Sequence, residues 1–293
     1  MRDAQASRTA LLIAATLVLL HHDPKHASAV PESSADLCRR MLETYSARSR
    51  LFLKLARWRW IRVIAKLIAR FMIPGVLLHY ALRKKCIARL ARAAVGNGTE
   101  QLVVIGAGFD PLAFELHQEF RDLHVWEIDH PATQRHKSRA CPEMDSERFH
   151  FMANDLSTAA LDRSALRNSG FDPAQPTFWI AEGILMYLPS DSVSTLIKTL
   201  NDLSASGSQF VFTFMEKQND GRIRFRSQSR LVDWWLRARG EPFVWGATRN
   251  ELVNFVKPWR ATRFFDHNDL RQIDSALANE ALATGEVICL AEL

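Results

Sequence analysis

Glycines and carboxylates recur in this sequence at points where short apolar runs end. Gly106 and Gly108 follow one such run, and glycine there lets the backbone turn tightly and approach a ligand closely. Asp129 ends the next run, at the distance along the chain where an acid can accept hydrogen bonds from ribose hydroxyls. This spacing indicates a site for a ligand that contains a nucleoside.

Two further runs end in acids that face the same edge of a sheet. Asp155 and Leu156 follow the third run, where a carboxylate could bind the exocyclic amine of adenine and a leucine could pack on its ring. Glu182 ends the fourth run and precedes a glycine. Each feature also has a structural interpretation, because Asp129, Asp155 and Glu182 could cap helices and Gly106 could serve a plain turn.

The glycine spacing separates two cofactor classes. A dinucleotide site needs the pattern G-x-G-x-x-G, but Pro111 stands where the third glycine would be. S-adenosylmethionine has no pyrophosphate, so the looser Gly106-x-Gly108 pattern suffices for it. A nucleotide-dependent oxidoreductase is therefore the weaker alternative.

Strand and helix patterns alternate through the second part of the chain, which predicts an α/β fold with a parallel sheet and right-handed crossovers. The pattern predicts strands over residues 101–106, 124–129, 148–153, 177–182, 209–214, 261–266 and 286–291. It predicts helices over residues 111–120, 131–139, 157–168, 190–203, 222–239 and 250–256.

Four segments in this order resemble the leucine carboxyl methyltransferase family: VIGAGFDPLAFEL, VWEIDHPATQRHK, ANDL and AEGILMYLP. The resemblance extends from about residue 7 to the C-terminus. It implies a Rossmann-like class I methyltransferase with a mostly parallel seven-stranded sheet and helices on both faces. It also implies S-adenosylmethionine as the cofactor, with a basic helical cap over residues 1–98 and a cofactor-binding core over residues 99–293.

The resemblance implies cofactor contacts position by position. Gly106 and Gly108 match the glycines under the cofactor, Asp129 the acid on its ribose, Asp155 and Leu156 the adenine contacts, and Glu182 the acid near its methionine part. Arg83 matches the arginine that pairs with the cofactor carboxylate, and Lys84 or Lys85 could serve instead. The chain has Asp-Pro-Leu from Asp110 where many members have Asp-Thr-Arg.

The methyl acceptor is expected to be a small molecule. Residues 40–74 lack the pattern of the branch that methylates a protein phosphatase, so a protein C-terminus is not expected. No residue stands out as a general base, which favours a carboxylate or an acidic hydroxyl as acceptor. Catalytic residues stay unknown, with Tyr187 as a weak candidate for a substrate contact, and no metal site is expected, because His79, His117, His130 and His267 lack metal spacing. A non-catalytic protein that binds a ligand or a membrane is the alternative.

Charge divides the chain into two parts. The net charge is +6, yet residues 44–99 contain 13 Lys and Arg and no acid, so the rest of the chain is acidic. Arg59 and Arg62 in this stretch could hold an acidic acceptor. Basic and apolar residues interleave over residues 51–70, which could form a helix that covers the active site or contacts an anionic membrane. No nucleic-acid motif accompanies the charge.

The first residues could form a secretion signal or a buried helix. The apolar run from Thr9 to Leu20 follows Arg2 and Arg8, and residues 27–29 resemble a cleavage site. Asp3 and the polar residues 21–26 argue against export, and the run is too short to span a bilayer. Four widely spaced cysteines indicate free thiols, so we expect a cytoplasmic protein.

Overall fold

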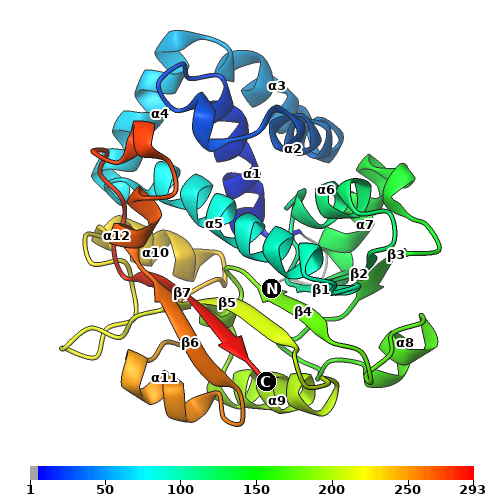
Figure 1. The fold of residues 1–293 in the computed structure, drawn as a ribbon. Helices are drawn as coiled ribbons and strands as arrows, with labels where there is room; N and C mark the ends of the chain where they lie inside the picture. The colour runs from blue at the N-terminus through cyan, green and yellow to red at the C-terminus, as the bar shows by residue number, and fades with distance from the viewer. Residues whose placement is uncertain (1–5) are drawn as a thin grey trace.

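Short apolar runs pair into one sheet in the computed structural model, which describes residues 6–293 (Figure 1). The seven strands have the order β3-β2-β1-β4-β5-β7-β6. Neighbours among β1 to β5 are parallel, and β7 is antiparallel to both β5 and β6, so the predicted mostly parallel sheet is confirmed. The strands are β1 (Gln101–Ile105), β2 (His124–Asp129), β3 (Phe149–Ala153), β4 (Thr177–Ala181), β5 (Gln209–Met215), β6 (Arg260–Phe265) and β7 (Glu286–Glu292).

Side chains of the central strands alternate between two apolar layers, as strands buried on both faces require. In β1, Leu102 and Val104 join one buried cluster, whereas Val103 and Ile105 join the other. Both faces are therefore covered by helices, as predicted. The first layer includes α5 (Val76–Gly96), α6 (Leu112–Glu119), α7 (Pro131–Ala140) and α12 (His267–Arg271), and the second includes α8 (Arg163–Asn168), α9 (Ser190–Asp202) and α11 (Arg249–Phe255).

The helices before the first strand share the core of the sheet. They are α1 (Arg8–His21), α2 (Glu32–Tyr45), α3 (Ala47–Ala56) and α4 (Arg59–Met72), followed by α5. One cluster of buried side chains extends from Ala6 to Ile288 and so joins these helices to β7. The division into a cap over residues 1–98 and a core over 99–293 stays a prediction.

The apolar run near the start of the chain forms α1, whose residues Leu17 to Leu20 are buried. Arg2 and Asp3, which bear on the secretion signal, lie outside the described residues. Between residues 6 and 293, no helix has both the length and the apolar character to cross a bilayer.

Two predicted helices begin later than their sequence pattern indicated. The helix predicted over residues 157–168 starts at Arg163, because the Asp162 carboxylate caps it by accepting a hydrogen bond from the Ala165 N–H at 2.9 Å. The helix predicted over residues 222–239 is α10 (Arg230–Ala238), and a loop precedes it. In that loop the Arg226 N–H donates to the carbonyl of Thr284, just before β7, at 2.8 Å. A hydrogen bond to a distant part of the chain thus replaces the hydrogen bond that a helix would form.

The turn after β1 requires glycine for steric reasons. Gly106 has a φ of +69°, and a Cβ atom there would lie 2.4 Å from the Cδ1 atom of Ile184. The chain can therefore leave β1 at this angle only where no side chain projects.

We expect the substitution Gly106→Ala to lower the free energy of unfolding by about 2–5 kcal/mol, through backbone strain and a clash with Ile184. Gly170→Ala is the matched control, because Gly170 has a φ of +92° but no atom within 4 Å of the added Cβ. The control should lose only about 1 kcal/mol. Urea unfolding followed by circular dichroism measures both, and equal losses would contradict the steric explanation.

Candidate active site

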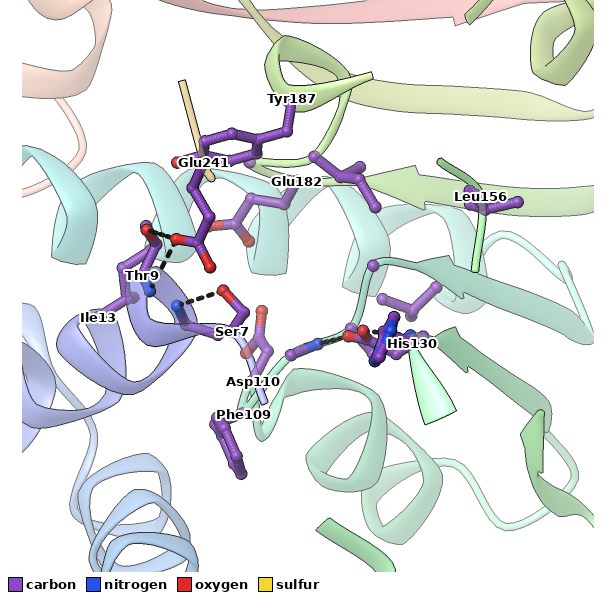
Figure 2. Close-up of a pocket in the computed structure, with 18 of the residues that line it drawn as sticks. Ser7, Thr9, Ile13, Phe109, Asp110, His130, Leu156, Glu182, Tyr187 and Glu241 are labelled. Atoms are coloured by element: carbon purple, nitrogen blue, oxygen red, sulfur yellow. Dashed lines mark hydrogen bonds between the residues drawn. The ribbon is translucent and has the colours of Figure 1, made fainter. Parts of the chain in front are cut away.

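A cavity of about 160 Å³ lies between the first turn of α1 and the turns that follow β1, β2, β3 and β4 (Figure 2). Strand order reverses between β1 and its neighbours β2 and β4, which is where ligands bind in open α/β sheets. All eight residues predicted for the site line this cavity: Arg83, Gly106, Gly108, Asp129, Asp155, Leu156, Glu182 and Tyr187. The fold therefore brings all the predicted site residues to one cavity, and their roles stay predictions.

Asp129 is held by backbone N–H groups at the end of β2. Its two carboxylate oxygens accept hydrogen bonds from the N–H of Gly108 and, at 2.5 Å, from the N–H of His130. Burial raises the pKa of Asp129, although these hydrogen bonds oppose the shift. The predicted alternative that Asp129 caps the next helix is wrong, because the His130 ring caps α7.

His130 and Asp155 face each other across the cavity wall. Nδ1 of His130 accepts a hydrogen bond from the Ala132 N–H at 3.2 Å, so Nε2 carries the proton and lies 3.7 Å from Asp155 Oδ2. Burial opposes ionisation of Asp155, but hydrogen bonds from the Ser157 side chain and backbone lower its pKa. No helix begins at Asp155, so its interpretation as a helix cap is wrong, and Leu156 beside it is buried.

A buried arginine crosses from α5 to the sheet beside the cavity. The Nε atom of Arg83 donates to Glu182 at 2.8 Å, and its Nη1 atom donates to both oxygens of Glu286 at 2.7 and 2.8 Å. Burial disfavours the charged guanidinium, yet the two carboxylates raise the pKa of Arg83 overall. The same guanidinium lowers the pKa of Glu286 to about 2, against the opposing effect of burial.

The neighbouring lysines divide between the cavity and the surface. The Nζ atom of Lys84 lies 2.6 Å from Asp110 and 3.3 Å from Glu182, and Lys84 lines the cavity. Lys85 pairs with Asp274 instead and does not line it. Arg83 and Lys84 are therefore the cations that a ligand in the cavity can reach.

A buried lysine on α7 holds the turn after β1 in place. The Nζ atom of Lys137 donates to the carbonyl of Asp110 at 2.5 Å and to the Glu127 carboxylate at 2.7 Å. Burial raises the pKa of Glu127 to about 7, although Lys137 opposes the shift. This pair holds the loop that carries Gly108 against β2.

Negative charge dominates the cavity wall. Five carboxylates line it, from Asp110, Asp129, Asp155, Glu182 and Glu241, against the two cations Arg83 and Lys84. The wall therefore favours a ligand with positive charge, and the sulfonium and ammonium groups of S-adenosylmethionine meet this requirement. Hydrogen-bond acceptors at Asp129 and Asp155 and the apolar Leu156 fit its adenosine part. The residues present fit this cofactor.

Glu241 is a cavity residue that sequence analysis missed. Its carboxylate accepts hydrogen bonds from the backbone N–H groups of Arg8 and Thr9, at 3.2 and 3.3 Å, and from the Thr9 hydroxyl (Figure 2). It thus caps the first turn of α1 from the loop after α10. Residue spacing could not have found Glu241, because 232 positions separate it from Thr9.

Tyr187 lies beside Glu241 at this end of the cavity (Figure 2). Its ring centroid lies 5.4 Å from that of Phe243, and burial raises its pKa well above the usual value. The expectation that Arg59 and Arg62 hold the acceptor is wrong for this cavity, since neither residue lines it. Arg62 instead donates to the carbonyls of Ala56 and Arg57.

The other titratable candidates lie outside the cavity. His79, His117 and His267 do not line it, and the Nε2–H of His79 donates to the Glu286 carboxylate at 2.9 Å. The four cysteines are buried and free of disulfides, as predicted. Within residues 6–293, no group of three His, Cys, Asp or Glu side chains could hold a metal ion.

The model of the family described as leucine carboxyl methyltransferase matches residues 11–201. The chain is also similar to proteins whose names assign them as S-adenosyl-L-methionine-dependent methyltransferases. One from Mycolicibacterium smegmatis is 32% identical over 165 residues, which are 55% of this chain and 52% of that protein. One from Mycobacterium sp. strain JLS is 34% identical over 172 residues, 56% of each chain. The chain spans about half the length of these curated relatives.

A solved structure shares the fold over most of both chains. The crystal structure of a protein from Thermobifida fusca, assigned in its title as a methyltransferase, aligns with a TM-score of 0.59 at 16% identity. The alignment covers 87% of this chain and 92% of that one. Together with the sheet order, it establishes the class I methyltransferase architecture.

We expect Glu286→Gln to lower the free energy of unfolding at pH 7 by about 3 kcal/mol, because it leaves Arg83 buried with one carboxylate fewer. The pKa of Glu286 is lowered to about 2 from 4.5, so its stabilisation is present above pH 4.5 and is lost as the pH falls towards 2. Urea unfolding at pH 7 and at pH 3 should therefore show a smaller difference between the two proteins at pH 3. A difference that does not change with pH would contradict the ion pair.

Proposed function

The chain belongs to the leucine carboxyl methyltransferase family, and on that premise we propose that it methylates an oxygen of a small molecule with S-adenosylmethionine. The observation that carries the proposal is the cavity wall. Residues that resemble the family's cofactor contacts come from five separate parts of the chain, yet all of them line one acid-rich cavity. The parallel sheet brings the strand ends to one edge, and the acids and glycines that stand there suit a single ligand.

The proposed cofactor contacts follow the wall from one end to the other. Asp155 and Leu156 would hold the adenine, Asp129 the ribose, and Glu182 with Arg83 the methionine part. Gly106 and Gly108 would let the backbone approach the ligand, since no side chain projects there. The bound cofactor supplies a methyl group on a sulfonium, which is already activated for displacement.

The protein's own contribution is then to position the acceptor and exclude water. The first turn of α1 covers the cavity, and its contact with Glu241 holds it there. Tyr187, Thr9 and Ile13 line the same end, so we place the acceptor beside them. The cover leaves room for a small molecule and supports the expectation of a small-molecule acceptor.

Acceptor chemistry depends on whether a base is needed. A carboxylate acceptor is already ionised, whereas a hydroxyl must lose its proton in the reaction. Glu241 lies beside Tyr187 in the cavity wall (Figure 2), and it would take that proton. The cofactor already brings one carboxylate into the cavity, and the excess of acids on the wall disfavours another from the acceptor. We therefore favour a hydroxyl acceptor over a carboxylate.

The state of the cysteines supports a proposal about where the protein works. All four cysteines are free and buried, which is usual in a reducing compartment. We therefore propose that the protein works in the cytoplasm.

We expect Asp129→Ala to weaken binding of S-adenosylhomocysteine at least about tenfold, which is about 1.4 kcal/mol, because the ribose loses its acceptor. Isothermal titration measures this affinity. Glu147→Ala is the control, because Glu147 is an exposed acid at the opposite end of β3. A folded wild-type protein that binds no S-adenosylhomocysteine would reject the cofactor, and equal affinity of the Asp129 variant would reject this residue's role.

We expect Glu241→Gln to reduce kcat for phenol acceptors about 10²-fold or more, because the hydroxyl loses the group that takes its proton. Transfer of labelled methyl groups to panels of phenols and carboxylic acids measures this. Thr9→Val is the matched control, because it removes one contact of α1 with Glu241 and keeps the carboxylate. Equal losses in the two variants would limit Glu241 to holding α1, and transfer only to carboxylic acids would reject the hydroxyl acceptor.

A further inference from the structure

Helix α4 presents its apolar stripe to solvent instead of to the core. Trp60, Val63, Ile64, Leu67, Ile68 and Phe71 recur at helical spacing, and each is at least 50% exposed. None of the residues of α4 is buried. The preceding turn adds Trp58, which is 66% exposed. An apolar surface of this size on a folded protein indicates a binding partner.

Basic side chains flank this stripe without acidic partners. Arg48, Lys54, Arg57, Arg59 and Arg70 are exposed, and none of them forms an ion pair with a residue in the range 6–293. Arg50 on α3, Arg62 on α4 and Arg89 on α5 likewise form no ion pair within residues 6–293, whereas the other five cations of the acid-free stretch do. Lys66 pairs with Asp23, and Arg83, Lys84, Lys85 and Arg92 pair with acids elsewhere in the fold. Most of the unpaired positive charge of this stretch therefore lies on α3, α4 and the turn between them, beside the apolar stripe.

Helix α10 extends the surface at the end of α4. The Ser229 N–H, just before α10, donates to the carbonyl of Met72 at 2.9 Å, so the two helices adjoin there. Leu231 and Trp234 on α10 are 61% and 67% exposed. Arg230 and Arg237 on the same helix are exposed as well. The surface is therefore built from two separate parts of the chain, and each part combines exposed apolar with exposed basic side chains.

Two occupants would cover apolar area of this kind: a second copy of the chain or a lipid surface. A second copy would bring the unpaired cations of α3 and α4 against an equal set, and the surface offers no exposed acids to neutralise them. An anionic membrane matches both features, because lipid headgroups neutralise the Arg and Lys side chains while Trp and Phe insert at the acyl boundary. We propose that α3, α4 and α10 form a docking surface for anionic lipid membranes.

The docking surface lies close to the cavity. Ile73 and Val76, at the junction of α4 and α5, share a buried apolar cluster with Met186. Ala69 of α4 and Tyr187 of the cavity wall pack against that same cluster. A membrane in contact with α4 would thus be one layer of side chains from the end of the cavity where the acceptor is proposed to bind. The docking proposal itself does not depend on methyl transfer.

Vesicle flotation tests the proposal directly on the full chain. The probes are vesicles of phosphatidylcholine alone and vesicles with about 30% phosphatidylglycerol, each at 0.15 M and 1 M NaCl. We expect several-fold more protein to float with the anionic vesicles at low salt, and the excess to fall at high salt, where screening is strong. No flotation with anionic vesicles would overturn the proposal.

Paired variants distinguish binding through the docking surface from non-specific adsorption to vesicles. Trp60→Ser with Phe71→Ser should reduce partitioning into anionic vesicles at least about tenfold. Val253→Ser is the control, because Val253 is 41% exposed on α11, whose buried residue Leu252 belongs to the second apolar layer. Arg59→Gln with Arg70→Gln should reduce the preference for anionic vesicles while leaving the apolar stripe intact. Unchanged flotation of the Trp60 and Phe71 variant would overturn the proposal.

Further measurements distinguish a loss of membrane binding from unfolding and from self-association. Binding of S-adenosylhomocysteine and the melting temperature report whether each variant is folded, independently of lipid. Sedimentation equilibrium reports self-association. A wild-type dimer that the Trp60 and Phe71 substitutions convert to a monomer would identify the surface as an interface between copies and would overturn membrane docking.

Discussion

The ion-pair cluster around Arg83 is the interaction on which the rest of this structure depends. Arg83 comes from α5, Glu182 from the end of β4 and Glu286 from β7, so a single guanidinium joins the N-terminal helices to two strands. A buried cation without these partners would cost several kcal/mol. Because both carboxylates are needed, the position of α5 over the sheet edge and the shape of the adjacent cavity are determined together.

The first helix follows from that arrangement. With α5 beside the sheet, α1 packs against α5 and α2 (Figure 1). The first turn of α1 thereby reaches the cavity. Glu241 receives the N–H groups that begin α1, so a carboxylate neutralises the positive end of a helix while also lining the site. The first turn of α1 therefore both covers the cavity and lines it. The end of the cavity where we place the acceptor is formed in part by this helix, which precedes every strand in the sequence.

Helix α4 shows the opposite use of an amphipathic pattern. Its periodicity resembles that of any surface helix, yet its large apolar residues face outward. Only its other side, which carries Ala65 and Ala69, packs half-buried against the core. Periodicity defines an apolar stripe but carries no information about which side the rest of the fold will occupy. For this reason the sequence allowed both a cover over the site and a membrane contact over residues 51–70.

Local features of the sequence determined the elements and most of the candidate site. Buried strands that end in glycine or acid have strong short-range signals, so β1 to β5 and the positions of Gly106, Asp129, Asp155 and Glu182 could be predicted. Helix starts were predicted less well, because Asp162 caps α8 through a side chain that competes with the periodic pattern. Of the residues brought in by long-range packing, Arg83 was predicted only through the family resemblance, and Glu241 was not predicted.

Tertiary structure alone decided which charges meet. Glu241 and Glu286 carry no local signal, and they reach α1 and Arg83 only after the sheet and helices have assembled. Tertiary structure also decided that Arg59 lies outside the cavity while Arg83 lies in its wall, although both belong to the same acid-free stretch. The physical reason is that side-chain type and spacing act over a few residues, whereas burial and electrostatic pairing depend on surfaces that only the folded chain brings together.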